Sequence, residues 1–329
     1  MLDRMLQTFA NRRQRTRPQL FALALASTLV VHAGSANAED DNALFHQMRS
    51  GGIGLTDDVT TEIPSLAFID SSGEPVDSAK VKKRLDTLAR AGGIQRFIRD
   101  SVVAPIAIDM DSITNPDGQR IGHLLDVAFV VHAPIDLIED SDTLQSLLGL
   151  SNEADGTDDA TEREEAGEAN NVTAEEFSKL GITLDAESES FGRVSFPLLD
   201  RVLITGVIHA ETERRIEGSP SDFVTVAWQM DPRFENSWSP IERNDLGEEV
   251  TGDAKPYRGL GGLITATRLP ADIAGSDTDA TVVQAKLVVH EPVDWFGGRN
   301  QLRSKLPLII QDRVRDLRRK LAEVHDASR

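Results

Sequence analysis

The chain has 329 residues, no cysteine and a formal net charge of −19, from 54 acidic and 35 basic side chains. The lack of cysteine excludes disulfides, thiolate metal sites, cysteine nucleophiles and lipid attachment at a cysteine. The acidic excess argues against nucleic acid as a partner and against broad electrostatic attachment to anionic membranes, because both of these carry negative charge.

Residues 1–38 are typical of a secretory signal peptide. A flank with five arginines precedes an uncharged apolar run over residues 20–33, and Ala36-Asn37-Ala38 supplies the small residues that signal peptidase requires. We therefore expect cleavage after Ala38 and an exported, periplasmic or extracellular mature protein. The alternative is an uncleaved anchor, but the run is shorter than the roughly 18 to 20 residues that cross a bilayer. No later run approaches that length, so no transmembrane span is expected in the mature chain.

Residues 51–66 are expected to form a turn and short extended pieces, and two helices are predicted after them. Apolar side chains recur at helical spacing over residues 78–91, where Ser78 is a suitable N-terminal cap and Gly92-Gly93 ends the helix. A second, short helix is expected at 94–99.

The strands are predicted from runs of Val, Ile and Thr between clusters of turn residues. An extended segment at 106–113 ends in the turn sequence Asn115-Pro116-Asp117-Gly118. Five further segments follow, at 124–132, 202–211, 223–230, 262–269 and 281–290. No amphipathic helix of crossover length separates the last four, so antiparallel hairpins are expected rather than a doubly wound parallel sheet.

One long connection differs in composition. Residues 151–171 carry eight acidic side chains against Arg163 alone and almost no large apolar residues. Such a segment repels itself and has little to bury, which predicts a disordered acidic insert in an otherwise single domain over residues 39–329. Directly after it, Thr173-Ala174-Glu175-Glu176 is typical of a capping box that opens a short helix ending at Gly181.

The final helix has the clearest pattern. Over residues 307–324 an apolar stripe repeats at spacings of three and four, and the opposite side is charged. Pro307 is either the first helical residue or a kink after a preliminary turn, and the sequence leaves both open. The stripe has to pack on something, so we predict an α+β fold in which this helix lies across the antiparallel sheet.

Three histidines stand at strand ends, His132, His209 and His290, and they raise the question of a zinc site. The alternation of side chains along a strand argues against one, because each histidine has the opposite parity to the apolar face of its strand and is expected to point outward. The tripeptide His209-Ala210-Glu211 is similar to the start of a zinc deaminase signature, whose Pro-Cys-x-x-Cys partner this chain cannot supply. We therefore predict no metal site, no catalytic residue and no cofactor.

Around Trp295-Phe296-Gly297-Gly298-Arg299-Asn300, with Phe196-Pro197-Leu198-Leu199-Asp200 and Met230-Asp231-Pro232-Arg233-Phe234 upstream, the chain resembles uncharacterised exported proteins of planctomycete-type bacteria. That resemblance implies one continuous domain and no known activity. The architecture of a curved sheet followed by a long amphipathic helix also resembles the helix-grip fold of START-type lipid-binding domains.

Two function classes follow from these expectations. The first is an exported, non-catalytic module that binds an apolar small molecule or lipid between the sheet and the last helix. Its candidate contact residues share apolar character and the inward parity: Phe129, Trp228, Met230, Leu287, Leu306, Ile310 and Val314. The second class is a structural or protein-interaction component of the cell envelope with a fully packed core. An enzyme of unrecognised type is the third possibility.

Overall fold

The computed structural model describes residues 43–70, 75–135, 172–183, 188–215, 222–243, 249–275, 279–297 and 299–327. The expected signal peptide at 1–38 and the expected acidic insert at 151–171 lie outside these residues. Among the helices in the described ranges, none has both the length and the apolar character that a membrane span requires.

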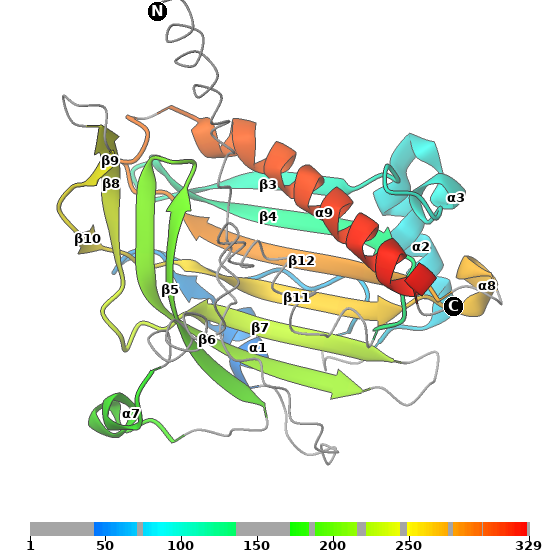
Figure 1. The fold of residues 1–329 in the computed structure, drawn as a ribbon, viewed down its shortest axis with the longest axis horizontal. Coiled ribbons are helices and arrows are strands. Elements are labelled where there is room, and N and C mark those ends of the chain that lie inside the picture. Colours follow the sequence, from blue (N-terminus) through cyan, green and yellow to red (C-terminus); the bar gives the residue numbers. More distant parts are fainter. Residues whose placement is uncertain are drawn as a thin grey trace, which may run out of the picture.

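The centre of the fold is a ten-stranded sheet whose strand pairs are all antiparallel. Six strands make its main body, in the spatial order β3 (Ala107–Thr114), β4 (Arg120–Val131), β12 (Thr281–His290), β11 (Leu260–Arg268), β7 (Phe223–Met230) and β6 (Val202–Arg215). Beyond them, β6 also pairs with β5 (Glu189–Leu198) and β8 (Ser237–Arg243), and β8 pairs with β9 (Glu249–Thr251) and β10 (Lys255–Pro256). Figure 1 shows β5 and β6 as long, curved strands at one end of this sheet.

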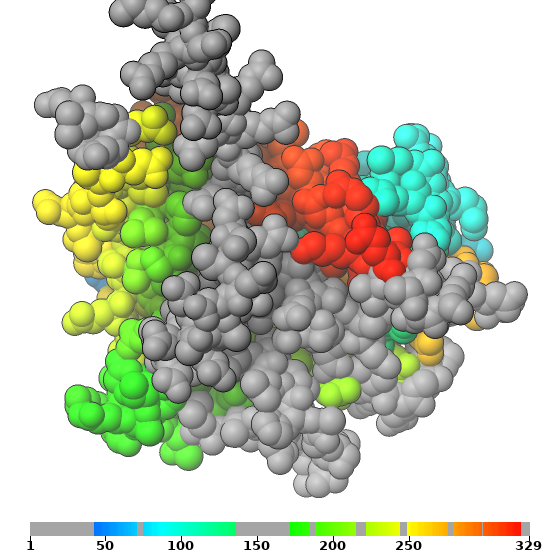
Figure 2. Space-filling view, in the orientation of Figure 1, coloured from blue at the N-terminus to red at the C-terminus, as the bar shows by residue number. Residues whose placement is uncertain are grey.

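One face of the sheet is covered by α9 (Gln301–Ala327), which crosses it in Figure 1. The strands turn alternate apolar side chains toward this helix, and the helix returns Leu302, Leu306, Val314 and Leu317, all of them buried. These side chains form the largest core cluster of the described chain. The outer face of α9 lies at the molecular surface in Figure 2, beside the cyan residues that include α3 (Ile94–Phe97).

The opposite face of the sheet is covered by the N-terminal part of the described chain. Helix α1 (Ala43–Ser50) and the strand pair β1 (Ile53–Gly54) and β2 (Thr60–Thr61) belong to a layer that packs on Ala227, Leu263 and Val288 of the central strands. A neighbouring cluster joins α2 (Ser78–Ala89), α3 and α8 (Ala271–Ala274) to β4 and β12. The sheet is therefore buried on both faces.

The predicted fold class is confirmed: the protein is α+β, with a large antiparallel sheet and the C-terminal helix packed on it. The bounds 223–230 and 281–290 agree with β7 and β12, and Thr173 caps α7 (Ala174–Leu180) with the expected capping box and a left-handed Gly181.

Other details differ from the sequence expectation. Helix α9 begins at Gln301, so Pro307 lies inside it. Asp77 rather than Ser78 caps α2, accepting a hydrogen bond from the Lys80 amide, and the Ser78 hydroxyl donates to Asp272 instead. Strand β6 continues to Arg215, because its charged end pairs with β7.

Candidate functional site

The seven residues predicted to contact an apolar ligand lie in one place. Six of them are buried in the cluster beneath α9, and Ile310 is partly buried against it. Trp228 and Leu306 have no exposed surface, and Leu287 has the largest exposed fraction of the six, at 7%. The strand register and the helix stripe therefore bring the set together, as a layer of side chains in mutual contact.

Among these seven residues, one buried polar atom has no hydrogen-bond partner in the described structure. The indole Nε1 of Trp228 is buried, and no described group accepts a hydrogen bond from it. A buried N–H without an acceptor costs free energy, since it loses its water without replacement. An apolar ligand that carries one oxygen could accept the missing hydrogen bond from this indole N–H.

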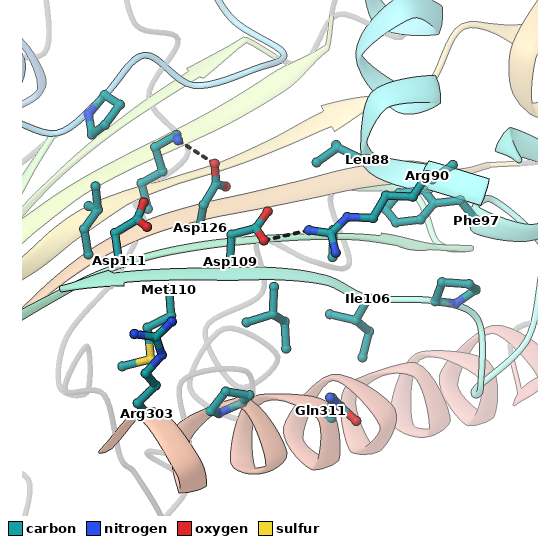
Figure 3. Close-up of a pocket in the computed structure, with 18 residues that line it drawn as sticks. Leu88, Arg90, Phe97, Ile106, Asp109, Met110, Asp111, Asp126, Arg303 and Gln311 are labelled. Atoms are coloured by element: carbon teal, nitrogen blue, oxygen red, sulfur yellow. Dashed lines mark hydrogen bonds and ion pairs between the residues drawn. The ribbon is translucent and has the colours of Figure 1, made fainter. Parts of the chain in front are cut away.

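A groove of about 900 Å³ lies elsewhere, along β3 at the end of the sheet. It is lined by β3 itself, by the C-terminal end of α2 and by the first half of α9. In Figure 3, Ile106 and Met110 point toward α9 and Gln311, whereas Asp109, Asp111 and Asp126 lie on the other side of the strand. The side chains of β3 therefore give the groove a mostly apolar side, to which α9 adds Arg303 and Gln311, and a charged side, as the pleat of β3 dictates.

Two ion pairs occupy the charged side. Arg90 reaches Asp109 at 2.6 Å between Nη2 and Oδ1, and Lys286 bonds Asp126, whose other oxygen accepts from Gln284 at 2.9 Å. The Arg90–Asp109 pair is mostly exposed, so it contributes little to stability. Asp111 is exposed beside them.

The outer edge of β3 is the second feature of this groove. Within the described ranges β3 pairs with β4 alone, and it ends the strand order of the sheet. Every second residue of such a strand directs its backbone N–H and C=O away from the sheet. Another edge strand, β5, pairs only with β6 among the described strands; it contains Pro197, and its Arg193 forms an ion pair with Glu176 of α7. By contrast, β3 contains no proline.

The three histidines at strand ends do not meet. His132 Nε2 lies 2.7 Å from the Ile98 carbonyl, and His290 Nδ1 lies 2.9 Å from the Arg258 carbonyl. His209 is buried beside Glu189 and Glu211. The expectation that His209 points outward is therefore wrong, because Phe191 of β5 stacks on its ring and the neighbouring Glu211 is hydrogen-bonded to α1.

Charge and burial oppose each other around His209. Burial lowers the pKa of His209, and the charge of Glu189 acts in the other direction. Burial also raises the pKa of Glu211, whereas its hydrogen bond from the Leu44 amide lowers it. The sequence pattern His209-Ala210-Glu211 is visible in the chain but does not by itself indicate a metal site. Glu189 had no sequence signal, because it lies on β5, a strand that the sequence did not predict.

No protein-family model and no curated protein matches this chain. A functional assignment therefore depends on the geometry above.

Proposed function

We propose that this chain is an exported, non-catalytic binding module that holds an extended segment of a partner protein along the outer edge of β3. The observation that carries the proposal is the groove at this edge, where β3 pairs with no further strand of the described residues and lies between a mostly apolar side and a charged side. Addition of a strand to an exposed sheet edge is a general mode of peptide recognition, in which backbone hydrogen bonds give affinity and side-chain pockets give specificity.

The pleat of the sheet dictates the chemistry of the occupant. A strand added to β3 alternates its side chains between the two faces, as β3 does. One set meets Ile108, Met110 and Pro307, with Arg303 beside Met110, and is expected to be mainly apolar. The other set meets Asp109, Asp111 and Asp126, of which Asp109 and Asp126 are already paired with Arg90 and Lys286. The surplus is negative, so this set is expected to be basic.

Charge also argues for a different protein as the partner rather than a second copy. Two copies paired through β3 would bring Asp109 and Asp111 of both strands together, and like charges across a strand pair are destabilising. The net charge of −19 adds long-range repulsion between copies.

Selection of extended peptides from a random display library on the purified protein tests this proposal. Selected peptides should alternate apolar and basic residues, and their binding should slow amide hydrogen exchange in β3 but not in β5. Asp111→Lys reverses a charge beside the groove and should weaken binding by about tenfold. Asp253→Lys makes the same change at an exposed position between β9 and β10, and should leave the affinity unchanged. Equal effects of both variants, or exchange in β3 that is unaltered by a bound peptide, would refute the proposal.

A second proposal is the apolar ligand between α9 and the sheet. Its support is the buried Nε1–H of Trp228, which has no described acceptor and could donate a hydrogen bond to a ligand oxygen. In this case the binding surface is the interior of the molecule rather than its edge.

A further inference from the structure

We propose that Glu189, His209 and Glu211 bind a divalent transition-metal ion, with Zn²⁺ as the best match to their chemistry. The three side chains lie on β5 and β6, at the other end of the sheet from β3, so this site is independent of the peptide groove.

Strand register brings the three residues together. Glu189 on β5 lies directly opposite Glu211 on β6. His209 precedes Glu211 by two residues, and residues two apart on a strand share a face. All three side chains therefore project from neighbouring positions on the second face of the sheet, the face that α1 covers.

The distances suit a single ion. His209 Nε2 lies 3.3 Å from Glu189 Oε1 and 3.9 Å from Glu211 Oε1, and the ligand atoms of all three residues fall within 4.8 Å of one another. Two ligands at about 2.0–2.2 Å from a tetrahedral Zn²⁺ are roughly 3.3–3.6 Å apart. Shifts of side-chain torsions that leave the backbone in place close the remaining difference.

The histidine is the second, independent indication of a ligand. Its side chain is only 9% exposed, and its Nε2 directed at the carboxylates has no hydrogen-bond partner in the described structure. The ring is held in place by Phe191, which stacks on it at 4.3 Å between centroids and 7° between planes. A buried, oriented ring nitrogen that faces two carboxylates without a hydrogen bond of good geometry to either requires an explanation, and a metal ion supplies one.

The surrounding contacts position Glu211 for the same role. Its Oε2 accepts a hydrogen bond of 2.8 Å from the Leu44 amide in the first turn of α1, while Oε1 faces His209. Outer contacts of this kind fix the orientation of metal ligands. The nearby cation of Arg233 bonds to Asp231 through two nitrogens and also interacts electrostatically with Glu189.

The residue types select the metal. Imidazole with carboxylates favours zinc and its neighbours among the first-row divalent ions over Ca²⁺ and Mg²⁺, which prefer sites made of oxygen alone. Three protein ligands leave the fourth position of a tetrahedral ion to water or to a ligand. A cation here also removes the repulsion between two carboxylates that the sheet places opposite each other.

Zinc binding to the chelator-treated protein tests the site. Because the chain carries 54 acidic residues, the titration is made in excess Mg²⁺ to occupy weak surface sites, with a chromogenic chelator as competitor. One zinc per chain should bind, and the melting temperature should rise. Glu189→Gln, Glu211→Gln and His209→Gln should each weaken binding by about 10- to 100-fold. His290→Gln and Glu242→Gln, which change the same residue types elsewhere, should bind as the wild type does.

The unliganded variants keep the test decisive. Glu189→Gln removes one of two opposed charges, so without metal its melting temperature should equal or exceed that of the wild type, and added zinc should no longer raise it. A wild type that takes up no zinc under these conditions would overturn the proposal. Unaltered zinc affinity in the three glutamine variants would overturn it equally.

Discussion

Arg318 is a buried cation in the apolar layer between α9 and the sheet. Its guanidinium donates to the carbonyls of Val130 and Ala104 at 3.0 and 2.6 Å, and it lies over the ring of Phe129 at 5.8 Å. Burial lowers the pKa of Arg318 to about 10, with the nearby cations Arg315 and Arg99 as smaller causes. The side chain therefore stays charged at neutral pH and ties the end of β4 and the segment before β3 to α9.

Replacing Arg318 should lower the free energy of unfolding much more than replacing the neighbouring Arg319. Arg318→Ala leaves buried carbonyls without donors, so the free energy of unfolding should fall by about 3 kcal/mol. Arg318→Lys should lose part of this, because an ammonium does not reproduce the planar fork of donors. The matched control is Arg319→Ala, whose side chain is 58% exposed in an ion pair with Asp316. Urea denaturation that gives equal losses for positions 318 and 319 would contradict the assigned role.

At the scale of the element, α7 depends on a capping box. The Thr173 hydroxyl accepts a hydrogen bond from the Glu176 amide, and Glu176 accepts from the Thr173 amide and binds Arg193 of β5. The pKa of Glu176 falls from 4.5 to about 2, mainly because its carboxylate accepts the hydrogen bond from the Thr173 amide. The ion pair with Arg193 lowers this pKa further.

This depressed pKa predicts how α7 responds to acid. A carboxyl with a lowered folded-state pKa stabilises the fold above its unfolded value of 4.5, and that stabilisation is lost as the pH falls toward about 2. Hydrogen exchange in α7 should be faster in Glu176→Gln than in the wild type at about pH 6, and the difference should shrink by about pH 3. Glu175→Gln is the control on the same turn. A difference that stays constant with pH would show that the carboxylate charge has no part in the cap.

The elements that sequence could predict are those whose signal is local. The strand at 281–290 is an unbroken run of strand formers between turns, and Thr173 and Gly181 mark both ends of α7. Strand β5 was not predicted, because Gly192 and Pro197 interrupt its pattern, although an edge position tolerates both. The charged end of β6 was also missed, since its strand conformation comes from pairing with β7 rather than from its own side chains.

The two candidate sites depend on longer-range information. Parity correctly assigned Phe129, Trp228 and Leu287 to the face under α9. The same parity could not show that the other face is covered as well, or that His209 is buried there against Phe191. Glu189 joins His209 only through the register of a strand pair, which no local pattern specifies.

At the scale of the whole molecule, the sheet offers two different places for binding: its covered faces and its edge at β3. Its two faces are covered by α9 and by the N-terminal layer, whereas its end at β3 borders a groove and has no further partner strand in the described ranges. The peptide proposal places its partner at the β3 edge, whereas the apolar-ligand proposal places its ligand inside, between α9 and the sheet. Peptide addition at β3 leaves the interior unchanged, but an apolar ligand must displace side chains that now touch one another beneath α9.

Native mass spectrometry distinguishes the two. If the interior takes a ligand, protein purified without detergent should carry an apolar molecule, and Trp228→Phe should reduce its retention by roughly 2- to 12-fold, the value of one neutral hydrogen bond. Trp295→Phe is the matched control, because its Nε1 is also buried without a partner but the residue is outside the predicted contact set. A wild type that has the mass of the polypeptide alone, and whose melting temperature is unchanged by fatty acid or phospholipid, contradicts the interior proposal. The β3 groove does not depend on this outcome, because its lining leaves out all seven predicted contact residues.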